Sequence, residues 1–166
     1  VGLGGEIKEL GLLNVNIDAE SSWWVGSLVG NNEGTVSNCY ATGVVTGSDN
    51  TGGLVGKNAD GVVSNCYANV SVIGTDVHVG GITGSNVGTL SNCYATGSVT
   101  GDDYVGGLMG LNNGTVTNCY AAGTVMGDSG SAGNPSYRIG GFVGTNIGTI
   151  SNCYATGAVT GDNFVG

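Results

Sequence analysis

Cysteine is the side chain in this sequence with the widest chemistry, because thiolates bind metals and two thiols can form a disulfide. The chain has five cysteines, and each stands in the same tripeptide, Asn-Cys-Tyr. The usual metal sites need several Cys or His ligands at short spacing, such as C-x-x-C. No such pair occurs, and the one histidine is His78. The sequence therefore predicts no metal site at the five cysteines, which are Cys39, Cys66, Cys93, Cys119 and Cys153.

Aspartates are the second group of residues that could bind a ligand, because they recur in the turn that follows each copy of this tripeptide. Calcium binds carboxylate, carbonyl and amide oxygens, and Gly-Asp-Asp or Gly-Asp-Asn turns could supply them. The Gly-Gly-x-Gly-x-Asp repeat of calcium-binding solenoids is absent from the sequence. A solvated acidic edge is favoured over a calcium site, and no cofactor is predicted. The aspartates concerned are Asp49, Asp76, Asp102, Asp103, Asp128 and Asp162.

The overall charge excludes several classes of partner. The chain has 166 residues and a formal net charge of −9, and its three bases are Lys8, Lys57 and Arg138. Nucleic acids and anionic membrane surfaces are bound through clusters of Lys and Arg, so neither is predicted as a partner. No apolar run approaches the roughly 20 residues that a membrane-spanning helix needs.

The elements that position these residues must repeat, because the sequence itself repeats. Successive cysteines are 27, 27, 26 and 34 residues apart, and a Gly-[Gly/Ser]-apolar-x-Gly motif precedes each one. The longest gap holds a loop insertion, which we place at residues 128–138. Residues 1–24 form a degenerate first copy, in which Leu10 takes the cysteine position. Both ends of the chain cut through a repeat, so we expect residues 1–166 to be one repeat domain, a fragment of a longer protein.

The combined motifs resemble the GLUG-motif repeats, in which Gly-Leu-apolar-Gly is followed by G-x-N-x-G-T-[VI]-x-N-[CS]-Y-A-T-G. The resemblance covers nearly the whole chain in five copies. It implies a module of secreted or cell-surface bacterial proteins, including large adhesin-like proteins and surface metallopeptidases whose repeats accompany a catalytic domain. This sequence has no His-Glu-x-x-His motif, so no peptidase activity is carried over and the chain is predicted not to be an enzyme.

Each copy predicts short strands wound into one coil of a solenoid. Alternation after Cys39 places Ala41 and Val45 on the same inner face and Tyr40 on the outer face. The alternation breaks near Asn38, where we expect a corner. One coil cannot bury its inner face, but coils stacked about 4.8 Å apart share a continuous core. The predicted fold is an all-β parallel β-solenoid (β-helix) of about six coils of 26–27 residues, with about three short strands per coil and a right-handed path.

Stacking would align equivalent residues into columns, and two kinds of column have a structural interpretation. Asn tolerates the left-handed conformation of turns, and stacked amides can bond along a column. Stacked cysteines would have Cα atoms roughly 5 Å apart, within the disulfide range, yet parallel side chains and an odd count favour buried free thiols. The asparagine columns are Asn32, Asn58, Asn86, Asn112 and Asn146, and Asn38, Asn65, Asn92, Asn118 and Asn152.

The tyrosine after each cysteine points outward and forms the candidate partner-binding column. Exposed rings could stack on sugars or anchor a protein partner, but they could equally pack on one another and stiffen one face, which we favour. Threonine columns on the same coils raise a third hypothesis, ice binding, which their interruptions weaken. The tyrosines are Tyr40, Tyr67, Tyr94, Tyr120 and Tyr154.

These observations predict an extracellular or cell-surface structural module, a stiff stalk or spacer of a bacterial adhesin-like protein. The alternative is a module that binds a glycan or a host or cell-surface protein through its Tyr/Thr face. Open solenoid ends expose strand edges and core, so end-to-end association, extending to filaments, is expected. Some pectin-degrading enzymes are also β-helices, but their sites gather acids and bases in a cleft, whereas Lys8, Lys57 and Arg138 are scattered along this sequence.

Overall fold

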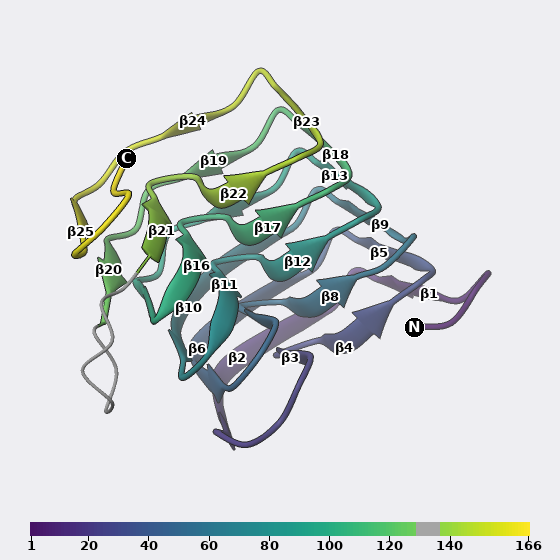
Figure 1. The fold of residues 1–166 in the computed structure, drawn as a ribbon. Coiled ribbons are helices and arrows are strands. Elements are labelled where there is room, and N and C mark those ends of the chain that lie inside the picture. Colours follow the sequence, from purple (N-terminus) through teal and green to yellow (C-terminus); the bar gives the residue numbers. More distant parts are fainter. Residues whose placement is uncertain (129–136) are drawn as a thin grey trace.

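The chain winds into stacked coils whose short strands form four parallel sheets (Figure 1). The computed structural model describes residues 1–128 and 137–166. Equivalent residues of successive coils are partners, as in Leu90↔Val116 and Val72↔Val99. The described part of the chain has no helix, and therefore no apolar helix that could span a membrane. The expected all-β parallel β-solenoid is confirmed.

The first two sheets flank the corner formed by the Asn-Cys dipeptide of each copy. In the last three coils, the strand of the second sheet is split where a glycine such as Gly97 packs directly on the backbone of the coil before it. The first sheet contains β1 (Glu6–Lys8), β5 (Thr35–Ser37), β9 (Val62–Ser64), β13 (Thr89–Ser91), β18 (Thr115–Thr117) and β23 (Thr149–Ser151). The second contains β2 (Gly11–Ala19), β6 (Tyr40–Gly47), β10 (Tyr67–Gly74), β14 (Tyr94–Ala95), β15 (Val99–Gly101), β19 (Tyr120–Ala121), β20 (Val125–Gly127), β24 (Tyr154–Ala155) and β25 (Val159–Thr160).

The other two sheets flank the glycine-rich motif of each copy. The third sheet contains β3 (Val25–Gly26), β7 (Thr51–Gly52), β11 (Val77–Gly80), β16 (Asp103–Gly106) and β21 (Tyr137–Gly140). The fourth contains β4 (Val29–Asn32), β8 (Val55–Asn58), β12 (Thr83–Asn86), β17 (Met109–Asn112) and β22 (Val143–Asn146).

The numbers of coils and strands differ from those expected. About five coils are complete rather than six, because the degenerate first copy contributes only β1 and β2 to the sheets. Each complete coil uses four sheets instead of about three strands, because the chain turns sharply at the double glycine between the third and fourth sheets. A Cβ at Gly81 would overlap the carbonyl oxygen of Gly107 in the next coil, so this turn stacks without room for a side chain.

The core consists of apolar columns that run along the solenoid axis. Leu54, Ile82 and Leu108 are fully buried and equivalent in successive coils. The same column is only partly buried at its ends, at Leu28 and Phe142, because no further coil covers them. Burial of one coil therefore depends on the coil above and the coil below it.

The corner expected near Asn38 is present in every coil. Asn38 and its four equivalents have φ between 52° and 53°, in the left-handed (αL) region that Asn tolerates. Of the insertion expected at residues 128–138, residues 129–136 lie outside the described residues. On either side of them the coils pair in register, through Asp103↔Tyr137 and Val125↔Val159.

Candidate binding surface

The tyrosine column forms a continuous stack on the outside of the second sheet. Neighbouring ring centroids are 4.8–5.1 Å apart, and neighbouring planes are within 5° of parallel. In-register pairing of Tyr67 with Tyr94, and of Tyr94 with Tyr120, imposes this arrangement. The structure thus brings all five sequence-predicted tyrosines together as one ladder.

The inner rings of the ladder expose their edges to solvent, whereas their faces are covered. Each inner ring is covered on both faces by its neighbours, and Gly11 lies so close to the ring of Tyr40 that a Cβ there would overlap it. Tyr154 ends the stack and is the most exposed member, at 58%. Partial burial raises the pKa of the Tyr120 hydroxyl, and the neighbouring Tyr94 and Tyr154 raise it further. The inner rings can therefore present hydroxyls and ring edges to a partner, but no flat face for stacking on a sugar.

The two asparagine columns are built differently. The first four amides of the first column are buried and Asn146 is exposed. Each buried amide donates to the next, Asn32 to Asn58, Asn58 to Asn86, Asn86 to Asn112 and Asn112 to Asn146, over 2.7–2.9 Å. The second column lies at the αL corner, where Asn118 donates to Asn92 and Asn92 to Asn65, over 3.3 and 3.1 Å. The buried column thus pairs its own polar groups from coil to coil, and both columns stand at turns.

The cysteine column is a set of free thiols facing the core. Each thiol donates to the carbonyl oxygen two residues before it, as Cys66 does to Ser64 over 3.1 Å. Burial raises the pKa of the Cys39 and Cys153 thiols. A hydrogen bond with Cys93 lowers the pKa of the Cys66 thiol to about 7.

The aspartates lie at the entrance to the third sheet but do not form a calcium cage. Asp49 accepts from the amide of Asn50 (2.8 Å) and lies 3.1 Å from Nδ1 of His78. Burial raises the pKa of Asp102, and the charges of Asp128, Asp76 and Asp103 raise it further. Across residues 1–128 and 137–166, no three acidic, His or Cys side chains come close enough together to hold a metal ion. Asp162, the last of the predicted acidic column, lies in the final turn.

A second αL column escaped the sequence analysis, because its residues change from coil to coil. It immediately precedes the inward residue of the third sheet, and its φ values lie between 48° and 60°. For side chains other than Gly, Asn or Asp, this conformation costs of the order of 1–3 kcal/mol. We call it the αL ridge; its members are Trp24, Asn50, His78, Tyr104, Arg138 and Phe164.

Three side chains of the αL ridge, those of His78, Tyr104 and Arg138, contact one another along the solenoid. The imidazole of His78 lies 4.9 Å from the ring of Tyr104, centroid to centroid, and the guanidinium of Arg138 lies 4.4 Å from the centroid of the same tyrosine ring. A Cβ at Gly144 would lie 2.6 Å from the carbonyl carbon of Tyr104, so the ridge backbone packs against glycines of the fourth sheet. The sequence could have revealed these residues only by their position, because each stands two residues before the first glycine of the glycine-rich motif.

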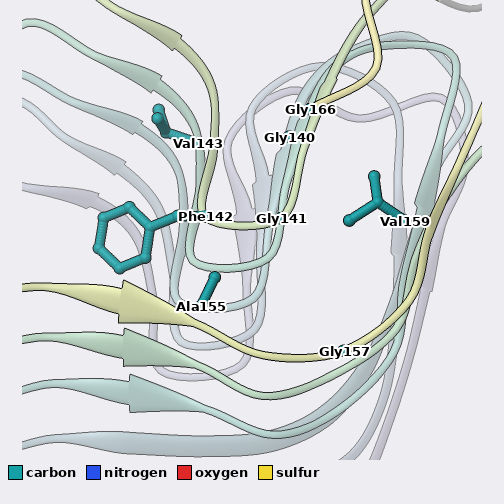
Figure 2. A pocket seen from close by; sticks show the side chains of 8 residues that line it. All are labelled: Gly140, Gly141, Phe142, Val143, Ala155, Gly157, Val159 and Gly166. Carbon is teal, nitrogen blue, oxygen red and sulfur yellow. The ribbon is translucent and has the colours of Figure 1, made fainter.

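A cavity of about 440 Å³ opens at the last coil (Figure 2). It is the uncovered end of the core columns, and Phe142 and Val159 project beside it from opposite sides of the coil. Its lining residues are Gly140, Gly141, Phe142, Val143, Ala155, Gly157, Val159 and Gly166.

Comparisons with known proteins agree with this architecture. The chain is similar to a crystal structure of a "putative immunoglobulin A1 protease" from Bacteroides ovatus, with a TM-score of 0.77 and 25% sequence identity. The match covers 95% of this chain and 55% of that one, so this chain spans about half the length of its structural relative. No curated protein matched the sequence. The model of the GLUG motif matches residues 22–46, 47–73, 76–100, 101–126 and 135–160. The chain therefore belongs to the GLUG-motif family.

Proposed function

We propose that this chain is a structural repeat module, a stiff stalk or spacer within a bacterial surface or secreted protein. The observation that carries the proposal is the unbroken parallel pairing from the first copy to the last in the first and second sheets. The apolar, asparagine and tyrosine columns each bond or pack along the same axis. Bending the solenoid would strain all of these columns together, which makes it stiff.

Such a spacer has a length set by its number of repeats. Each coil pairs its strands with those of its neighbours and adds about 4.8 Å to the axis. Extra copies would lengthen the stalk without changing its outer columns.

The proposal of an extracellular role draws on the name of the structural relative. Its name describes a protease directed at an immunoglobulin, a secreted protein, and this chain matches 55% of it. We infer that catalysis in such proteins belongs outside the solenoid, and that this chain supports or positions a separate catalytic or adhesive part.

The open ends of the solenoid also suit end-to-end association. The cavity beside Phe142 leaves apolar core uncovered at one end, and Leu10 and Leu13 are exposed at the other. Both ends present unpaired parallel strand edges, so a second copy could continue the same ladders.

Binding through the tyrosine face is the second candidate function. It is favoured by the regular outward row of five tyrosines at spacings of 4.8–5.1 Å. A glycan or protein partner would have to use ring edges and hydroxyls, except at Tyr154.

The spacer proposal is tested by lengthening the chain. Residues 76–101 would be duplicated after residue 101, and the particle measured by small-angle X-ray scattering. We expect the long dimension to grow by about 4.8 Å at an unchanged cross-section, with one cooperative unfolding transition. A thicker cross-section, or an independently unfolding copy, would contradict a stiff stalk.

A further inference from the structure

The chain contains two columns in the same left-handed conformation and fills them differently. The corner column is Asn in all five coils, whereas Asn50 is the one Asn of the αL ridge. Gly and Asn adopt this conformation most readily, and bulky side chains do so at a cost. In the five complete coils the corner column therefore holds the residue that the backbone conformation favours. The ridge retains Trp24, His78, Tyr104 and Arg138 against backbone preference, which indicates a role for these side chains beyond the turn.

The contacts within the ridge show which chemistry it accepts. The ammonium of Lys57 lies 5.6 Å from the ring centroid of Trp24, and the guanidinium of Arg138 lies 4.4 Å from that of Tyr104. Nη1 of Arg138 also donates to both carboxylate oxygens of Asp103 over 3.3 Å. Two of the three bases of the whole chain are thus held here by aromatic rings and a carboxylate. The ridge is already a binding surface for cations, and its present occupants come from its own chain.

Rings and carboxylates of the same kind remain open beside these pairs. Trp23 is 73% exposed, and Phe164 is 76% exposed with its centroid 6.2 Å from that of Tyr137. Within residues 1–128 and 137–166, no base lies within ion-pair distance of Asp76 or Asp102. The net charge of −9 would attract a basic molecule over a longer range. Trp, Tyr and Arg are also the residues that most often dominate protein–protein interfaces.

We propose that the αL ridge is a docking surface for a basic, Lys- and Arg-bearing segment of a protein partner. Cationic side chains of the partner would lie on Trp23, Trp24 and the Tyr137–Phe164 pair, in the way that Lys57 and Arg138 do within the chain. The ridge residues lie at the beginning of the third-sheet strands, whereas the tyrosines of the ladder lie on the second sheet. The ridge is therefore a different surface from the tyrosine face. It adds recognition to the spacer role and does not depend on it.

The first experiment locates binding on the unaltered chain. An isotope-labelled sample is titrated with an oligo-arginine peptide at an ionic strength of about 0.15 M, where long-range attraction is largely screened. We expect amide shifts to concentrate around Trp23, Trp24, Tyr137 and Phe164, and an oligo-glutamate peptide to cause none. Shifts centred on the tyrosine ladder, shifts spread evenly over the acidic surface, or the absence of binding would each overturn the proposal.

The second experiment separates the rings from the charge. The double variant Trp24→Asn/Phe164→Asn removes two of the proposed rings, keeps the net charge and introduces the residue that Asn50 already supplies in the same conformation. We expect it to unfold cooperatively and to bind oligo-arginine about tenfold more weakly, because the cation–π contacts are lost. Ile147→Asn, an equally neutral change at an exposed residue in the turn between β22 and β23, should bind like the parent chain. Equal affinity of all three proteins would show that net charge alone attracts the peptide, and would overturn the proposal.

Discussion

The rings of Tyr94 and Tyr120 lie parallel, with their centroids 4.8 Å apart and their planes at 2°. The spacing matches that of neighbouring strands in a sheet. The backbone pairing of β14 with β19 therefore sets the distance between the rings, and the rings in turn bind the two coils together. Each inner tyrosine takes part in two such contacts.

Replacing Tyr94 by Ala should lower the free energy of unfolding by about 1–3 kcal/mol, because two ring contacts of about 0.5–1.5 kcal/mol each are lost. Thermal unfolding monitored by circular dichroism measures the change. Tyr154→Ala is the matched control, since Tyr154 has one ring neighbour and should lose about half as much. Unchanged stability of Tyr94→Ala together with lost adhesion to cells or glycans would instead favour the tyrosine face as a binding site.

Replacing Asn86 by Ala should lower the free energy of unfolding by about 1–3 kcal/mol, because the buried amide bonds both Asn58 and Asn112. Denaturant unfolding at constant pH measures the loss. Asn146→Ala, at the exposed end of the same column, removes one column bond and should cost less. An equal loss of unfolding free energy in the two variants would mean that the number of column hydrogen bonds does not set the contribution of each asparagine.

Replacing Gly81 by Ala should destabilise the fold by about 3 kcal/mol, because the added methyl group would overlap the carbonyl oxygen of Gly107. Gly2→Ala is the control, since nothing lies within 4 Å of a Cβ at that position. Comparing the denaturation midpoints of both variants with the parent chain decides the matter. If Gly81→Ala were as stable as Gly2→Ala, the backbones of neighbouring coils would be able to move apart at the double glycine at little energetic cost.

Asp102→Asn should stabilise the protein at neutral pH, and the gain should shrink on acidification. Burial and neighbouring carboxylates raise the folded-state pKa of Asp102 above its usual value of 3.8. The folded state thus holds the Asp102 proton more tightly than the unfolded state. Protonated Asp102 therefore contributes fully to the stability of the fold below pH 3.8, and this contribution is lost as the pH rises through the folded-state pKa. Melting temperatures of both proteins between about pH 3 and pH 7 test this.

Asp60→Asn serves as the control for this pH series, since Asp60 is exposed in a turn. A gain for Asp102→Asn that persists unchanged at low pH would point to a cause other than charge.

Columns of identical residues could be predicted from the sequence because each copy shows the same residue at the same spacing. The tyrosine ladder, the cysteines and the corner at Asn38 are of this kind. Strands as short as Thr51–Gly52 were not predictable, because two residues cannot show alternation. The αL ridge was missed for the opposite reason: its backbone conformation repeats while its side chains do not, so Trp24 and His78 show no common pattern.

The buried asparagine column also has a direction. The amide nitrogens of Asn32, Asn58, Asn86 and Asn112 each donate to the side-chain oxygen of the Asn in the next coil. The dipoles of these side chains therefore add head to tail and polarise one another. The two ends of the stack are therefore chemically unlike. A fibre made by joining such units end to end would have a plus end and a minus end, as cytoskeletal polymers do, and two units meeting face to face would present mismatched donors and acceptors.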